Sequence, residues 1–149
     1  MLLVLGFLAF LGIGYLCFKG FQAIGAKRSM GNQDWLRKKL AGDSRFSQAD
    51  KLSVLDESAL AFHSRDQKIY LAQKEVDWIL SKSHPRKHNG WKVAIKDYSF
   101  ADFVSVEQVD NDFEPRHILL CGKVRSEEVR VAWGHTELVN ALKPLLTSK

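Results

Sequence analysis

Residues 56–72, DESALAFHSRDQKIYLA, contain the pattern that decides the fold. Leu60 and Phe62 alternate with alanines, and Ile69 and Leu71 repeat the same spacing after the polar run HSRDQK. Alternation with a period of two is typical of strands that have one buried face, and two such runs joined by a short polar segment indicate a β-hairpin. The joining segment contains no glycine, although tight hairpin turns commonly use one. We therefore predict two antiparallel strands joined by a glycine-free turn.

The alternating pattern continues toward the C-terminus. Further strands are predicted over residues 91–97 (WKVAIKD), 103–109 (FVSVEQV), 117–121 (HILLC) and 127–133 (EEVRVAW), with a turn at 110–115 (DNDFEP). In the first of these, Trp91, Val93 and Ile95 face the same way, and in the second the alternation breaks near Gln108, which indicates a β-bulge. The insertion at 74–90 includes EVDWIL, which fits a helical turn or a strand, and the basic loop SKSHPRKHNG.

The last segment changes to a helical period. Thr136 is a suitable N-cap, and one apolar face follows it. That face consists of Leu138, Val139, Leu142, Leu145 and Leu146. Pro144 is expected to kink or shorten the helix because proline removes a backbone hydrogen bond. The sequence therefore predicts an α+β fold of six or seven mainly antiparallel strands, closed into a barrel or sandwich by a C-terminal amphipathic helix.

The N-terminal stretch from residue 1 to residue 26 is apolar apart from Lys19 and Gln22. A helix of its first 18 residues, none of them charged, is roughly 27 Å long, which matches a bilayer core of about 30 Å. A secretory signal peptide has a basic region before its apolar core, and here none precedes it. We predict a retained transmembrane helix, with a cleaved signal peptide or a buried core helix as alternatives.

The net charge of +5 is concentrated beside this stretch. From residue 40 to residue 149 the 16 basic and 16 acidic residues cancel, which argues against a nucleic-acid partner. Basic residues next to an apolar span favour the cytoplasmic side. We therefore expect a single-pass protein of the inner (plasma) membrane with its C-terminal domain in the cytoplasm.

A short amphipathic helix is predicted from Asn32 to Gly42, either lying on anionic lipid headgroups or packed on the domain with its charges in water. The candidate contacts with lipid or with a protein partner are Lys27, Arg28, Trp35, Arg37, Lys38, Lys39, Arg86 and Lys87.

Part of the chain resembles a known family. DESALAFHSRDQKIYLA and, after the insertion, YSFADFVSVEQV are similar to small bacterial pleckstrin-homology-like (PH-like) domains, over roughly residues 55–146. Some proteins of this kind carry one N-terminal membrane helix and have no assigned function. The resemblance implies a PH-like barrel, a fold that serves lipid binding, peptide binding and scaffolding alike.

The sequence contains no spacing typical of a catalytic or metal site. His84 and His88 are four residues apart, but Pro85 between them argues against a shared helical face, and Cys121 lies in an apolar run. We therefore expect no enzyme activity, no cofactor, no metal and no disulfide.

These observations predict three parts. They are a transmembrane helix at 1–26, a basic juxtamembrane segment at 27–50 and a PH-like β domain at 51–149. The expected function is a membrane-tethered cytoplasmic binding or scaffolding module. An accessory subunit of a membrane complex and a small membrane-proximal enzyme are the alternatives. The expected partners are the lipid bilayer through residues 1–26, anionic headgroups, and a membrane or cytoplasmic protein.

Overall fold

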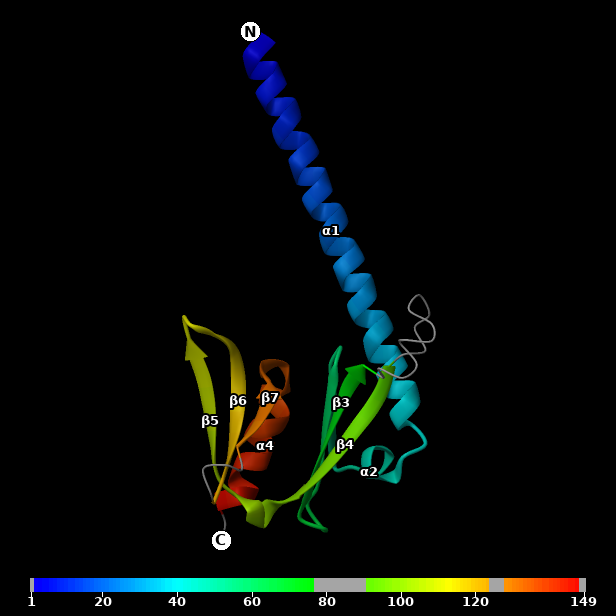
Figure 1. Cartoon of the computed structure of the whole chain (residues 1–149), viewed down its shortest axis with the longest axis vertical. Coiled ribbons are helices and arrows are strands. Elements are labelled where there is room, and N and C mark those ends of the chain that lie inside the picture. Colours follow the sequence, from blue (N-terminus) through cyan, green and yellow to red (C-terminus); the bar gives the residue numbers. More distant parts are fainter. Residues whose placement is uncertain (1, 77–90, 124–127, 148–149) are drawn as a thin grey trace.

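The computed structural model describes residues 2–76, 91–123 and 128–147, with the side chains of the N-terminal helix described from residue 12 (Figure 1). Its elements are, in order, α1 (Leu2–Leu40), α2 (Ser44–Ser47), β1 (Lys51–Val54), β2 (Ser58–His63), β3 (Lys68–Val76), β4 (Trp91–Ser99), η2 (Phe100–Asp102), β5 (Phe103–Asn111), β6 (Glu114–Gly122), β7 (Val129–Ala132), η4 (Trp133–His135) and α4 (Thr136–Thr147).

The strands form two antiparallel sheets, one with the order β1-β2-β3-β4 and one with the order β5-β6-β7. The chain passes from one sheet to the other through η2, where Ser99 and Asp102 form a reciprocal capping box. Within the described ranges, β4 pairs only with β3 and β5 only with β6, so the sheets are not closed. The predicted closed barrel or sandwich is therefore wrong. The hydrogen-bonded strands of the first sheet end with β4, and a separate sheet begins with β5 after the turn at η2.

The first core lies between the two sheets and α4. Leu60 and Ile69 from the first sheet, Ile118 from the second, and Val139 and Leu142 from α4 are all fully buried. Helix α4 packs against both sheets in this core and lies between the two sheets in Figure 1. The predicted amphipathic helix is present, and it continues past Pro144 to Thr147 rather than ending there.

The second core lies on the other face of the four-stranded sheet. The side chains of Leu36 and Leu40 on α1 are buried there against Ala59, Ala61 and Ala72. Because alternate residues of a strand point to opposite faces, the alanines of β2 face α1 while Leu60 and Phe62 face the first core. The small alanine side chains leave room on this face for Leu36 and Leu40 of α1.

The first helix differs from the sequence expectation. It runs unbroken from Leu2 to Leu40, so Asn32, where a separate helix was predicted to begin, lies inside it. In the described structure no helix is long and apolar enough to cross a membrane. The charges of Lys19, Lys27 and Arg28 interrupt the described apolar stretch, and charged groups are costly to place in hydrocarbon. This finding overturns the predicted single-pass anchor, together with the inner-membrane location and cytoplasmic orientation inferred from it.

The predicted central hairpin is confirmed. β2 pairs with β3 in the register that sets Leu60 opposite Leu71 and Phe62 opposite Ile69. The turn contains no glycine, and Gln67 instead adopts the positive φ, 53°, that a glycine commonly supplies in such turns.

Two apolar residues of the predicted strands remain exposed. The side chains of Trp91 and Val104 are 38% and 52% exposed. In β5 the pairing register shifts between Phe103 and Ser105, so that Phe103 is buried in place of Val104. The second register shift, between Val109 and Asn111, lies one residue beyond the break that the sequence indicated near Gln108.

Candidate functional site

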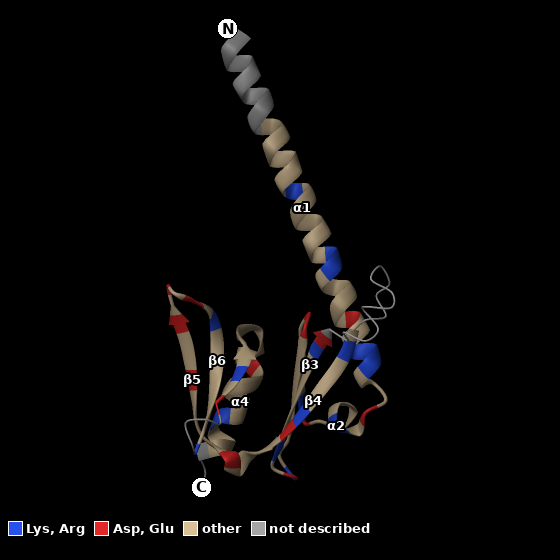
Figure 2. Ribbon diagram, in the orientation of Figure 1, with Lys and Arg blue, Asp and Glu red and all other residues tan. Residues whose placement is uncertain are grey.

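The candidate contact residues of the sequence analysis do not form one site. Arg28 and Trp35 line a pocket between α1 and the four-stranded sheet, whereas Arg37 lines a different pocket beside β1. Lys38 and Lys39 are exposed, with the Nζ of Lys39 6.0 Å from the centre of the Trp35 ring. Lys27 is also exposed, and Arg86 and Lys87 lie outside the described residues. The described cations of this set thus follow the helix surface, as Figure 2 shows, and among them only Arg28 lines the first pocket.

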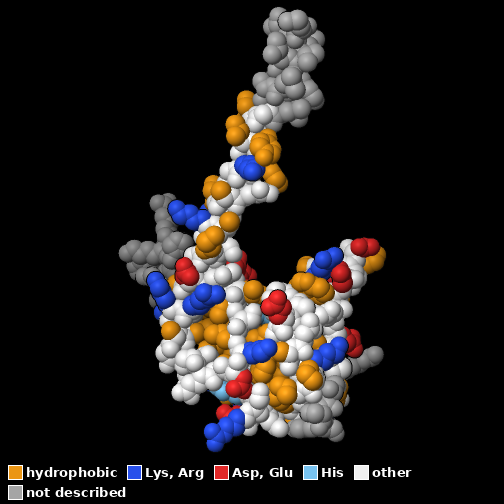
Figure 3. Space-filling model, turned by 180° about the vertical axis from the view of Figure 1, so that it is seen from behind, with side chains coloured by type: hydrophobic (Ala, Val, Ile, Leu, Met, Phe, Trp, Pro, Cys, Tyr) orange, Lys and Arg blue, Asp and Glu red, His pale blue; other side chains and the backbone are white. Residues whose placement is uncertain are grey.

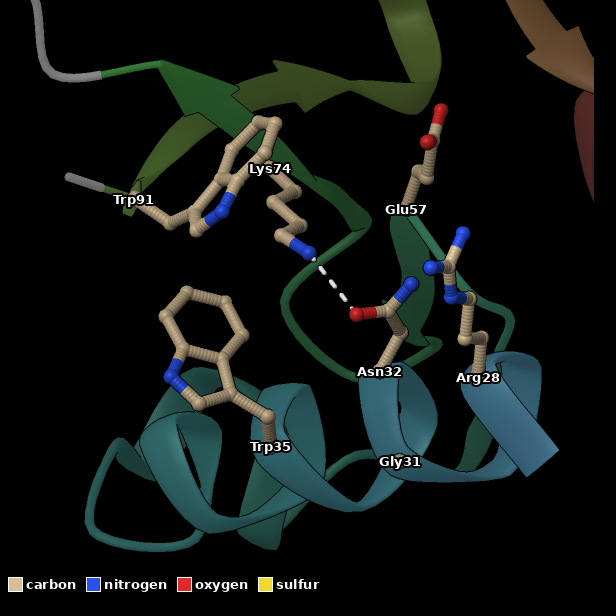
Figure 4. A pocket seen from close by; sticks show the side chains of 7 residues that line it. All are labelled: Arg28, Gly31, Asn32, Trp35, Glu57, Lys74 and Trp91. Atoms are coloured by element: carbon tan, nitrogen blue, oxygen red, sulfur yellow. Dashed lines mark hydrogen bonds between the residues drawn. The ribbon is translucent and has the colours of Figure 1, made fainter. Parts of the chain in front are cut away.

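The indole pocket is our name for the cavity of about 580 Å³ lined by Arg28, Gly31, Asn32, Trp35, Glu57, Lys74 and Trp91 (Figure 4). Arg28, Asn32 and Trp35 lie three or four positions apart on α1, a spacing that places them on one face of a helix. Lys74 on β3 and Trp91 at the start of β4 lie on the sheet that this face meets. The pocket is therefore formed by contact between a helix and a sheet that are separate in the sequence.

Lys74 is at the centre of the indole pocket. Its Nζ lies 4.3 Å from the centre of the Trp91 ring and 5.4 Å from the centre of the Trp35 ring. Both distances are within the range of cation–π attraction. The same Nζ donates a hydrogen bond of 2.9 Å to Oδ1 of Asn32. Figure 4 shows the lysine side chain reaching between the two tryptophans toward this amide. The ammonium group is thus held in a set position by three groups.

Polar contacts join α1 to the connection between β1 and β2, beside the pocket. Ser29 Oγ and Gln33 Nε2 donate to the same carboxylate oxygen of Asp56, at 2.5 Å and 3.1 Å. Asp56 lies in the connection before β2, one residue from Glu57 of the pocket. Together with the buried Leu36, these bonds anchor the lower end of α1 to the sheet, which gives the pocket a defined shape.

A second cluster surrounds His135. Its ring is fully buried, with Nε2 2.9 Å from Ser58 Oγ and Nδ1 2.8 Å from Ser53 Oγ. Burial lowers the pKa of His135 from 6.5 to about 4, so the ring is neutral at pH 7. A neutral imidazole has one donor and one acceptor nitrogen, so one serine accepts from the ring and the other donates to it. The cluster joins β1, β2 and η4 through side-chain hydrogen bonds.

This serine–histidine pairing is a poor catalytic arrangement. Ser53 does line the pocket beside β1, with a cavity volume of about 480 Å³. However, a ring whose pKa is about 4 is a weak general base near neutral pH, and both of its nitrogens are already occupied by hydroxyl groups. We therefore interpret the cluster as a structural link.

No group of three metal-ligating side chains is found in the described part of the chain. In the acidic turn at 110–114, two carboxylates form ion pairs with arginines. Asp110 accepts a hydrogen bond from Arg116 at 2.6 Å, and Glu114 lies 3.7 Å from Arg130. His84 and His88 are outside the described residues.

Comparison with known proteins gives no relative: no family model, no curated protein and no solved structure matches the chain. The resemblance to PH-like domains therefore stays a prediction, and the function must be argued from the site.

Sequence reasoning missed Lys74, Asn32 and Glu57. In β3, Lys74 follows Tyr70 and Ala72 at alternate positions. Strand alternation alone would therefore place its side chain on the same face of the sheet as theirs, which is the face that α1 covers. The sequence left open whether the segment from residue 32 packs on the domain, and it did not indicate which face of the sheet that segment would cover.

Proposed function

We propose that the chain is a non-catalytic binding module that assembles with a helical partner protein through α1. The observation that carries this proposal is the exposure of large apolar side chains on that helix. Ile13, Tyr15, Leu16, Phe18, Phe21, Ile24 and Met30 are each 55–75% exposed. Figure 3 shows these hydrophobic side chains along the part of α1 that projects from the domain. Contiguous apolar surface of this kind marks an interaction site.

The apolar side chains surround α1. Tyr15, Leu16, Cys17 and Phe18 are consecutive, and each step along a helix turns by about 100°. Four consecutive apolar residues therefore face every side. A helix that is apolar on all sides is stable in water only when other elements enclose it. The expected occupant is accordingly a group of partner helices around α1, rather than one helix along a single stripe.

Charge indicates the chemistry of that partner. The chain contains no acidic residue before Asp34, whereas Lys19, Lys27 and Arg28 lie along or just below the exposed stretch. In a self-assembly of parallel α1 helices, these like charges would face each other. A different protein whose helices carry carboxylates at the matching levels would pair with them. Charge thus favours a partner with acidic groups flanking an apolar helical surface.

Site-specific photo-crosslinking in cells tests this proposal. A benzoylphenylalanine is placed at Leu16 or at Phe18, which lie on nearly opposite sides of α1, and at Phe113 as the control. Phe113 is 95% exposed at the β5–β6 turn, so it tests non-specific capture. We expect adducts with the same protein from both α1 positions and none from Phe113. Lys19→Glu with Lys27→Glu should reduce the adduct yield several-fold.

Three results would contradict the proposal. They are an absence of protein adducts from both α1 positions, an adduct only with a second copy of this chain, and a yield that the double charge reversal does not change.

A further inference from the structure

We propose that the indole pocket binds a small aromatic anion, with a flat ring against the tryptophans and a carboxylate or phosphate group on Lys74. This site is separate from the exposed part of α1, and the inference does not depend on the helical partner. It rests on the position of one ammonium group, on the two rings beside it and on the charges at the pocket rim.

The ammonium group of Lys74 has donors left for a ligand. It carries three N–H groups, of which one donates to Asn32 Oδ1. The ion pairs formed among the described residues include neither Lys74 nor Arg28. Lys74 is half-buried, and no carboxylate of the described residues forms an ion pair with it. An anion that enters the pocket supplies this missing partner, and hydrogen bonds to charged groups are among the strongest in proteins.

The two tryptophans supply a surface for a flat ring. Trp35 is half-buried and Trp91 is 38% exposed, and both ring centres lie within 6 Å of the same nitrogen. In Figure 4 the Trp91 indole lies above the Trp35 indole, and the end of the Lys74 side chain lies beside both. An aromatic ligand can stack on an indole with ring centres about 4.5–7 Å apart while its anionic group reaches the ammonium.

Other classes of ligand fit this pocket less well. A cationic ligand would compete with Lys74, whose ammonium already lies against both rings. A neutral apolar ligand would cover Lys74 without pairing its charge. Among the described residues, two cations, Arg28 and Lys74, line the pocket against one carboxylate, the exposed Glu57. The cavity of about 580 Å³ is in the range of small-molecule sites, which span roughly 300–1,000 Å³.

Gly31 leaves room for the ligand at the α1 wall. A Cβ atom added at this position would have no neighbouring atom within 4 Å, so there is open space beside the helix backbone on this side of the pocket. We expect Gly31→Leu to place a side chain into this space and to weaken binding without disturbing the core.

The test is calorimetric titration of the purified full-length chain with four probes. They are 1-naphthoate, 1-naphthyl phosphate, the neutral analogue 1-naphthalenemethanol, and inorganic phosphate. We expect at least one naphthyl anion to bind, and the neutral analogue and inorganic phosphate to bind at least about tenfold more weakly. The comparison of naphthoate with naphthyl phosphate identifies which anionic group the pocket prefers.

Variants then assign the binding to the pocket. Lys74→Met keeps most of the unbranched side chain and removes its charge, so it should weaken binding about 10-fold or more, as expected for a charged hydrogen bond. Lys92→Met is the matched control. It removes one charge from β4 beside Trp91, but Lys92 is paired with Glu75 and does not line the pocket. If Lys74→Met lowers the melting temperature, Arg28→Gln on the exposed helix surface replaces it, with an expected loss of several-fold.

Three outcomes would overturn the inference. They are an absence of binding heat from both naphthyl anions at millimolar concentration, equal binding of the neutral analogue, and equal binding by the Lys74→Met and Lys92→Met variants. Loss of affinity in the Lys74 variant with an unchanged Lys92 variant supports it.

Discussion

Acid should destabilise this protein through His135. The ring is fully buried, and the two groups that contact its nitrogens, Ser53 and Ser58, are hydroxyls that do not offset a positive charge. Burial lowers the pKa of His135 in the folded chain from 6.5 to about 4. At pH 7.5 and above the ring is almost entirely neutral in both the folded and the unfolded chain, so its contribution to stability is nearly constant there. Between pH 6.5 and pH 4 the unfolded chain binds a proton that the folded chain does not, so stability falls with pH.

The size of this effect follows from the two pKa values. A pKa of 6.5 in the unfolded chain and about 4 in the folded chain predict a loss of about 2.5 kcal/mol between pH 7.5 and pH 4.5. The total reaches roughly 3 kcal/mol below pH 4. Two carboxyl groups have shifted pKa values, but both shifts lie below the pH range in which His135 acts. Arg45 lowers the pKa of Asp43, and the backbone N–H of Ser64 lowers the pKa of Asp50, so both titrate below 3.8.

Urea unfolding followed by circular dichroism at pH 7.5, 6.5, 5.5 and 4.5 measures the effect. The comparison is with His135→Asn, which has no titrating ring. We expect this variant to be less stable than the parent chain at pH 7.5, because an asparagine cannot reach both serines. Its free energy of unfolding should then change much less between pH 6.5 and pH 4.5. Parallel pH curves for the parent chain and the variant would refute the reasoning, since the acid sensitivity would then arise elsewhere.

Three further predictions concern substitutions that should lower the stability of the fold. Leu142 is fully buried between α4 and both sheets, so Leu142→Ala should cost about 2–5 kcal/mol of unfolding free energy, and an unchanged urea midpoint would contradict the role of α4 in the first core. Gly134→Ala would place a Cβ 2.9 Å from two carbons of Leu55, at a cost of about 1 kcal/mol, and thermal melts should show this cost disappearing in a Leu55→Ala background. Gln67 has a φ of 53°, so Gln67→Val should cost about 1–2 kcal/mol in urea titrations and Gln67→Gly should cost less; equal effects would argue against strain in the turn.

The elements best predicted from the sequence are those in which one face of a strand or helix is apolar. The hairpin around residues 60–71 and the stripe on α4 were recognised because their periods of two and 3.6 are local properties. The predictions failed where the residue pattern did not determine which surface would cover an element. Trp91 was assigned to the core by alternation, yet it lies at the start of β4, where the sheet ends and the indole pocket begins.

The N-terminal helix shows the same limit in a larger element. Its helical character was evident from an uninterrupted run without proline, but its length was not. The segment from Lys27 to Leu40 was divided from it on the basis of charge, whereas the backbone continues through that region. Charged side chains on a helix surface do not end the helix when its far end is anchored, here by Leu36 and Leu40 in the second core.

The sequence by itself determined the mixed α+β content, the central hairpin and the apolar face of α4, because each depends on residues that are neighbours along the chain. It also determined where the excess positive charge lies. Only the tertiary structure decided that the two sheets stay open, that α1 packs on the alanine face of the first sheet, and that Lys74 lies between two tryptophans. These features depend on contacts such as that between Asn32 and Lys74, which are 42 positions apart. The approach of α1 to the sheet creates the indole pocket, and no local pattern encodes it.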